Sequence, residues 1–182
     1  NGNFTPPAGQ ATEAGQTLAQ GISAGALVSI TNDLQTIAWD AVAATVADEE
    51  ALSPPGSSYV PLLIGVESVD DGIAPIPMVT GTSSMPTSMA LGATWDPYLS
   101  ETVGDVLGRE LAALGINLYL GPDLDVLYTP RPGDPADLGT QVFGGDPFWV
   151  GEMGTAYIRG LHQGSEGRLL VELERDELEF DG

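Results

Sequence analysis

Residues 96–120 decide the fold and read DPYLSETVGDVLGRELAALGINLYL. The stretch begins with Asp96-Pro97, an acid that can cap a helix followed by a proline suited to the first helical position. It continues to Gly115, a residue suited to a left-handed helix terminus, and then directly into the apolar run Ile116–Leu120. This order predicts a capped helix, a short turn and a buried strand.

The same construction occurs a second time in the chain. Asp146-Pro147 opens the second helix, Gly164 is its expected left-handed end, and the apolar run Arg168–Val171 follows. Upstream of both helices, Pro61–Val66 is apolar on both faces, as in a buried parallel strand. Strand, loop, capped helix and strand is the order of βαβ units, so the sequence predicts an α/β fold with a parallel sheet and outer helices.

Residues 1–58 form a helical excursion and a loop before this pattern. Apolar residues between Ala11 and Ala47 recur at helical spacing, and Gly21 with Gly25 is expected to divide them into two helices. Asp48–Ser58 is expected to be a surface loop. The second helix carries a stripe that we expect to be buried, made of Leu27, Ile30, Leu34, Ile37, Ala41 and Val42.

The chain is strongly acidic, with 26 Asp and Glu residues against five Arg and no Lys, for a net charge of -21 over 182 residues. Such a surface repels nucleic acids and anionic lipids. It attracts divalent cations, although a solvated acidic surface is the simpler interpretation. The absence of cysteine excludes disulfides and a thiol nucleophile. No apolar run reaches the roughly 18 residues of a membrane span.

Acidic residues follow the predicted strands, where the reactive groups of β/α enzymes lie. Glu67 ends the strand Pro61–Val66, and a carboxylate after so apolar a strand needs a partner or a ligand. Asp123 and Asp125 follow the next strand, and in an extended segment their carboxylates share a face. Asp125 is expected either to hold the following loop by hydrogen bonds or to contact a ligand.

Other chemistry-bearing residues have simpler structural interpretations. The single histidine, His162, lies near a helix C-terminus, where it favours the helix dipole, and with no cysteine a zinc site is not expected. Trp95 and Trp149 each lie beside a capping acid and are expected to be core anchors in preference to sugar-stacking platforms. Neither a metal nor a cofactor is therefore assigned.

Three runs of sequence, Pro86–Pro97, Gly104–Asp125 and Gly139–Pro147, resemble the N-terminal barrel domain of glycoside hydrolase family 3. That family includes β-glucosidases and β-N-acetylglucosaminidases. The resemblance implies a single domain over 1–182 that is part of a TIM-type (β/α) barrel, because a complete barrel takes about 250 residues. Residues 59–171 match best, and residues 172–182 resemble the segment before the strand that bears the family's nucleophile.

The resemblance also implies site residues, which depart from the family pattern. Glu67 takes the place of an aspartate that binds sugar hydroxyls, and Gln141 takes the place of a sugar-binding arginine. The family's Lys-His pair is missing, because Val171 is followed directly by Glu172, and we expect a gap of several dozen residues there. The nucleophile is expected beyond the last residue, so Glu67, Gln141 and Asp125 are predicted to bind substrate and no catalytic residue is assigned.

The function implied by the resemblance is retaining hydrolysis of β-glucosides or β-N-acetylglucosaminides, with carbohydrate as the partner and no cofactor. The 182-residue chain alone is expected to be inactive. One alternative is a non-catalytic carbohydrate-binding or structural module at the cell surface, and a weaker one is calcium-dependent assembly through the acidic loops. Gly154–Gly160 resembles a secreted or surface-anchored bacterial branch, which implies an extracellular or cell-surface location. Self-association, or association with the rest of the barrel, is also expected.

Overall fold

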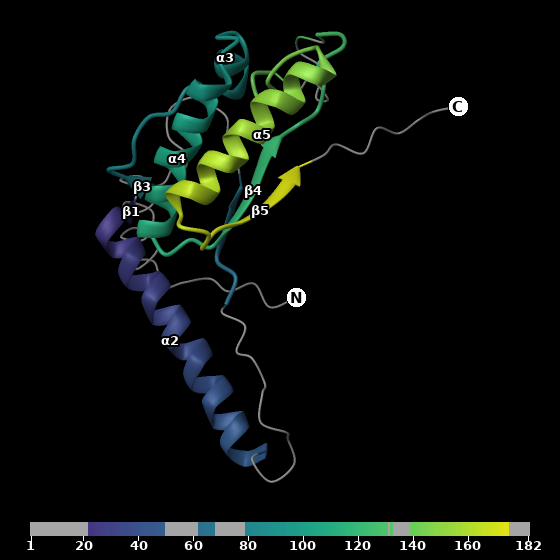
Figure 1. The fold of residues 1–182 in the computed structure, drawn as a ribbon. Helices are drawn as coiled ribbons and strands as arrows, with labels where there is room; N and C mark the ends of the chain where they lie inside the picture. The colour runs from purple at the N-terminus through teal and green to yellow at the C-terminus, as the bar shows by residue number, and fades with distance from the viewer. Residues whose placement is uncertain (1–21, 50–61, 68–78, 131, 133–138, 175–182) are drawn as a thin grey trace.

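The computed structural model describes residues 22–49, 62–67, 79–130, 132 and 139–174 (Figure 1). Within these ranges the chain forms both helices and strands. The elements in chain order are β1 (Ile22–Ser23), α2 (Ala24–Glu49), β2 (Gly65–Glu67), β3 (Val79–Thr80), α3 (Ser88–Gly92), α4 (Pro97–Ala113), β4 (Leu118–Asp123), α5 (Pro147–Gly164) and β5 (Leu170–Glu174).

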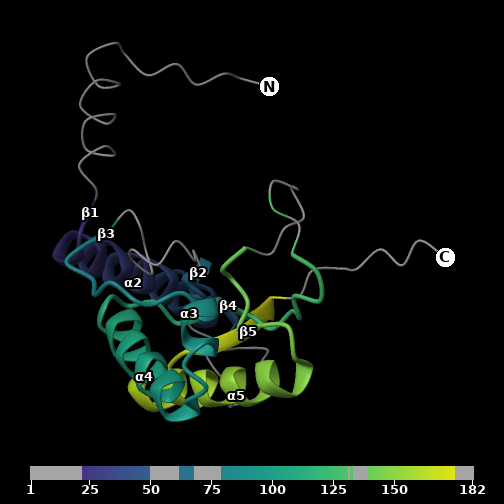
Figure 2. The same ribbon diagram turned by 90° about the horizontal axis from the view of Figure 1, so that it is seen from above.

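The main sheet has three parallel strands in the order β2-β4-β5. Helix α4 precedes β4 and helix α5 precedes β5, and both helices lie on the same side of the sheet (Figures 1 and 2). The predicted α/β fold with parallel strands and outer helices is therefore confirmed. A second sheet, in which β1 and β3 pair in parallel over two residues each, was not predicted, because such short strands leave no periodic signal.

The two long helices begin as the sequence predicts. Asp96 and Asp146 are the N-caps of α4 and α5, and each carboxylate accepts a hydrogen bond from a backbone N–H of the first turn. Gly115 follows the end of α4 with φ +80°, which confirms the predicted left-handed residue. The corresponding prediction for Gly164 is wrong. It is the last residue of α5, and the left-handed residues come later, at Glu166 and Gly167.

Gly164 is required for a different reason, which is the close packing of α4 against α5. A Cβ atom at Gly164 would collide with the carbonyl oxygen of Asp105, and one at Gly160 with that of Glu101. On the facing helix, a Cβ atom at Gly104 would collide with the carbonyl of Tyr157. Glycines four residues apart on both helices thus allow the two backbones to approach closely.

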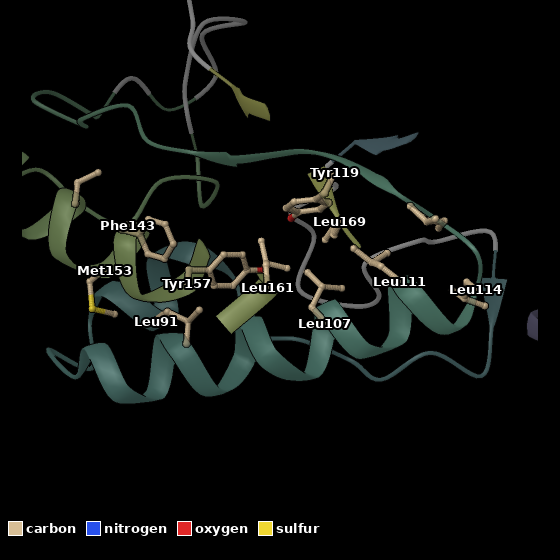
Figure 3. Close-up of a cluster of buried hydrophobic side chains, with 12 residues drawn as sticks. Leu91, Leu107, Leu111, Leu114, Tyr119, Phe143, Met153, Tyr157, Leu161 and Leu169 are labelled. Carbon is tan, nitrogen blue, oxygen red and sulfur yellow. The ribbon is translucent and has the colours of Figure 1, made fainter. Parts of the chain in front are cut away.

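The buried core lies between this helix pair and the sheet (Figure 3). Leu107 and Leu111 of α4, Met153 and Leu161 of α5, and Tyr119 of β4 are all almost fully buried. The remaining buried members of the cluster are Leu91, Leu114, Ile116, Phe143, Val150, Tyr157 and Leu169. Most of them come from the stretch 96–120 and from the second helix unit, as the sequence pattern indicates.

Helix α2 differs from its prediction in two ways. It begins at Ala24, so Gly25 lies inside its first turn and divides nothing; the predicted first helix and most of the predicted loop at 48–58 lie outside the described residues. The predicted buried stripe is wrong beyond its first residue: Leu27 packs against the core, but Ile37 is 64% exposed and Ile30 and Leu34 are also exposed. The helix extends away from the α4–α5 layer (Figure 1), which leaves this face uncovered by the described chain.

The prediction that Pro61–Val66 is buried on both faces is also wrong. The strand itself is Gly65–Glu67, and Leu62 and Leu63 before it are 40% and 51% exposed. Both leucines lie before the strand begins, and the described helices α4 and α5 cover only one face of the sheet, so side chains on its other face remain accessible.

Candidate functional site

The candidate site is the face of the sheet that points away from α4 and α5. Val66, Tyr119 and Val171 are register partners on adjacent strands, and all three pack against the core. Because successive side chains of a strand point to opposite faces, the next row must face the other way. That row is Glu67–Leu120–Glu172.

Glu67 therefore lies at the carboxyl end of β2 and on the uncovered face, where the resemblance implies a sugar-binding acid. Its side chain is exposed, so the argument that burial forces it to find a partner is wrong. An exposed carboxylate remains solvated and is available to accept hydrogen bonds from a ligand.

Hydrogen bonds from Asn117, just before β4, hold the chain that leads into β2 and so help to position Glu67. Its side-chain Oδ1 accepts a hydrogen bond from the backbone N–H of Ile64 at 2.7 Å, and its Nδ2 donates to the carbonyl of Leu62 at 2.8 Å. The backbone N–H of Asn117 also donates to the Ile64 carbonyl. Asn117 thus supports the chain immediately before Gly65–Glu67 from the neighbouring strand.

Asp123 and Asp125 lie at the carboxyl end of β4. The strand ends at Asp123, whose Oδ1 accepts a hydrogen bond from the backbone N–H of Asp125 at 2.7 Å. The carboxylate of Asp123 therefore stabilises the turn that follows the strand. Asp125 lies after this turn and is partly buried, so the extended segment that would align the two carboxylates stops at the first of them.

Gln141 lies in the loop before α5 and is exposed. Two backbone hydrogen bonds fix this loop. Met89 at the start of α3 donates to the Thr140 carbonyl at 3.1 Å, and Leu127 donates to the Gly144 carbonyl at 3.0 Å. The second bond joins the Gln141 loop to the segment that follows Asp125. The structure thus joins the loop that carries Gln141 to the segment after Asp125.

Glu172 is a site residue that the sequence interpretation missed. The sequence places it only in the segment 172–182, which resembles the stretch before the strand that bears the family's nucleophile. Leu169, Leu170 and Val171 are all apolar and show no alternation, so only the strand register assigns Glu172 to the face opposite the core. Strand β5 contains Val171 and Glu172 as consecutive residues, and the expected gap at this junction stays a prediction.

Of the two tryptophans expected to be core anchors, only one packs against the core. Trp149 is half-buried and packs against the core, which confirms its expected role as an anchor. Trp95 is 67% exposed, so its expected role as a core anchor is wrong. His162 is exposed in the last turn of α5, consistent with the structural interpretation.

Metal and membrane sites were also considered. Within the described ranges, no group of three or more His, Cys, Asp or Glu side chains is placed to hold a metal ion. The acidic loops that motivate calcium binding, with Asp70, Asp71, Asp134 and Asp137, lie outside those ranges. None of the helices in the described part of the chain is long and apolar enough to cross a membrane.

Parallel strands with acids at their carboxyl ends and helices on the outer face define part of a TIM-barrel-like domain. Residues 8–174 match the sequence family described as "Glycosyl hydrolase family 3 N terminal domain". The chain belongs to glycosyl hydrolase family 3. The resemblance inferred from the sequence motifs is thereby confirmed.

Relatives of known name support the same family. The chain is 36% identical over 76 residues to a probable β-glucosidase K of Emericella nidulans, an alignment that covers 42% of this chain and 9% of that protein. It is 37% identical over 82 residues to a β-xylosidase of Formosa agariphila, covering 44% of this chain and 11% of the relative. The matches thus span about a tenth of the length of these relatives.

A solved structure shows the same arrangement in space. The family 3 β-N-acetylglucosaminidase from Paenibacillus sp. str. FPU-7 superposes with a TM-score of 0.63 at 26% sequence identity. The superposition covers 85% of this chain and 25% of that one. The described fold therefore corresponds to part of a larger family 3 architecture.

Proposed function

We propose that this chain provides the sugar-binding face of a retaining β-glycosidase that acts on β-glucosides or β-N-acetylglucosaminides. The observation that carries the proposal is the position of Glu67 in a family 3 domain: it lies on the uncovered face of the sheet, at the carboxyl end of β2. Carbohydrate is the partner, because the hydroxyl groups of a sugar can donate hydrogen bonds to the carboxylate and amide oxygens of this face.

Each proposed ligand contributes a different interaction. Glu67 accepts hydrogen bonds from sugar hydroxyls, and Gln141 can both donate and accept through its neutral amide. Asp125 follows the turn that Asp123 stabilises. Two residues later, the backbone N–H of Leu127 donates a hydrogen bond to the carbonyl of Gly144, which lies in the loop that carries Gln141. The three residues come from the carboxyl ends of two strands and from one loop before a helix.

The 182-residue chain by itself is proposed to be inactive. Retaining hydrolysis uses two carboxyl groups about 5–5.5 Å apart. Glu67 and Glu172 are on strands that flank β4, so their backbones are separated by roughly 10 Å, twice the usual spacing of neighbouring strands. We assign both acids to binding because the resemblance gives neither of them a catalytic role, and the family's Lys-His pair has no counterpart in a chain without lysine.

The test measures turnover of aryl β-glucoside and aryl β-N-acetylglucosaminide substrates by the natural protein and by its Glu67→Ala variant. Intact-mass spectrometry first establishes whether the natural protein is longer than 182 residues. If it is longer, we expect it to release the aryl group and Glu67→Ala to lower kcat/KM at least about a hundredfold, as for a lost substrate contact that strengthens in the transition state. Unchanged turnover in Glu67→Ala would refute the assignment of this face.

A second candidate, a non-catalytic module that binds sugar or supports the cell surface, is favoured by one observation. Gln141 replaces one positive charge that the resemblance implies for the site, and the row formed by Glu67, Leu120 and Glu172 on this face carries two carboxylates and no cation. In that case the longer protein would bind oligosaccharide without releasing aryl groups. An extracellular or cell-surface location is proposed with either function, and fractionation of the native cells tests it.

A further inference from the structure

The stacked pair Trp95–Trp149 lies at the N-terminal ends of α4 and α5. The two rings have centroids 4.8 Å apart and planes inclined by 28°, which is a stacked arrangement. Trp95 is 67% exposed although one of its faces lies on Trp149. The opposite face of the Trp95 ring is therefore accessible to solvent.

The pair is held in place by one backbone carbonyl. The oxygen of Gly92, at the end of α3, accepts hydrogen bonds from the indole Nε1 of Trp149 at 3.1 Å and from the backbone N–H of Trp95 at 3.2 Å. Trp95 itself has φ +56°, a left-handed conformation that bulky residues rarely adopt. A large aromatic residue is thus held at the surface in an unfavourable backbone conformation, which is typical of functional positions.

The surroundings of the pair suit a neutral, hydroxyl-rich ligand. The exposed carboxylates of Asp96 and Asp146 begin the two helices beside the tryptophans, and their helix caps use only Oδ1 of each. The remaining oxygen of each can accept a hydrogen bond from a hydroxyl group. The net charge of -21 opposes phosphate-bearing ligands but not neutral ones.

We propose that the open face of Trp95 is a second carbohydrate site, which stacks on the C–H face of one pyranose ring of a β-linked oligosaccharide. The choice of ligand rests on the proposed function, whereas Trp95 is not among the residues proposed there. The carbonyl of Thr140, next to Gln141, accepts a hydrogen bond from Met89 in α3, and Trp149 donates to Gly92 at the end of the same five-residue helix. The tryptophan pair and the Gln141 loop are therefore held by the same short helix.

The test measures binding of cellopentaose and chitopentaose to the full chain by calorimetry. The key variant is Trp95→Asn, because asparagine tolerates the left-handed conformation while it removes the ring. The matched control is Phe148→Ala, since Phe148 is equally exposed (73%) but is not part of the stack. We expect Trp95→Asn to weaken binding of at least one probe about tenfold or more and Phe148→Ala to leave it unchanged.

The outcomes separate this site from the proposed function. In Glu67→Ala, binding at Trp95 persists even where aryl-glycoside turnover is lost, and a failed turnover assay leaves the Trp95 result intact. Equal binding by wild type and Trp95→Asn, or binding of neither probe by wild type, would overturn the proposal. A folded Trp95→Asn that loses affinity for an arginine-rich peptide but not for sugar would also overturn it, because the occupant would then be a cation over the ring.

Discussion

Glu67 of β2 and Glu172 of β5 lie on the same row of the sheet, one on either side of Leu120, and both face away from the helices. The row places Glu67 at the carboxyl end of β2, where β/α barrels carry their reactive groups, and Glu172 within β5. A family 3 chain with two acids and no lysine at this place is equipped to accept hydrogen bonds from a sugar. The relationship ties the fold to the proposed function.

Restoring the family's charge at the loop before α5 should strengthen sugar binding. In Gln141→Arg, the guanidinium adds up to five donors to a face dominated by carboxylates, so affinity for cellobiose or chitobiose should rise about tenfold, the effect of one charge-assisted hydrogen bond. Calorimetric titration measures it, and Gln163→Arg on α5 is the control for added charge. An equal gain in both variants would show that the effect is a general charge effect.

Asn117 is expected to act on stability and on the site together. Asn117→Ala removes the hydrogen bonds to Ile64 N–H and the Leu62 carbonyl and should lower the free energy of unfolding by about 1–3 kcal/mol. Because these bonds position the backbone just before Glu67, the affinity for sugar should fall as well. Asn117→Asp keeps the acceptor for Ile64 and should lose less on both counts. Urea unfolding and calorimetry give the two values, and a variant that loses stability with full sugar affinity would disprove the link.

The close approach of α4 and α5 predicts a large effect from one methyl group. Gly104→Ala places Cβ against the Tyr157 carbonyl and should destabilise the chain by about 1–3 kcal/mol, as overpacking does elsewhere. Gly151→Ala, on α5 with open space around its Cβ position, should instead be neutral or stabilising by about 0.5–1 kcal/mol. Denaturant unfolding of both variants tests this, and equal effects would mean that the helices are not packed as described.

The helix caps of α4 and α5 should contribute to the free energy of unfolding as N-cap residues usually do. Asp96→Ala and Asp146→Ala each remove a side-chain acceptor from a first-turn N–H and should each cost about 1 kcal/mol. Glu152→Ala, an exposed acid within α5, controls for the loss of one negative charge. If all three variants unfold at the same urea concentration, the carboxylates do not cap the helices.

Local signals predicted the parts of the fold that depend on local structure. Asp96, Asp146 and Gly115 were placed correctly, because capping and left-handed termination involve only nearby backbone groups. The role predicted for Gly164 is wrong because this position must lack a Cβ atom to avoid the backbone of Asp105 on another helix, and no local pattern reveals that contact.

Burial was the property that the sequence predicted least well. The apolar stripe of α2 and the residues Leu62 and Leu63 were expected inside, but helices cover only one face of the described sheet. Trp95 was misplaced for a similar reason, since its exposure depends on how it stacks upon Trp149. For the candidate site, Glu67, Asp125 and Gln141 were selected from sequence, whereas Glu172 required the strand register.

We propose that this polypeptide forms a sugar-binding face of family 3 and that none of its own acids is the nucleophile. Incubation of the 182-residue chain with an activated 2-deoxy-2-fluoro-β-glucoside, followed by intact-mass spectrometry, tests it most directly, because a retaining nucleophile forms a covalent glycosyl ester. We expect an unmodified mass. A stable gain of one fluoroglycosyl group on any Asp or Glu of this chain would contradict it.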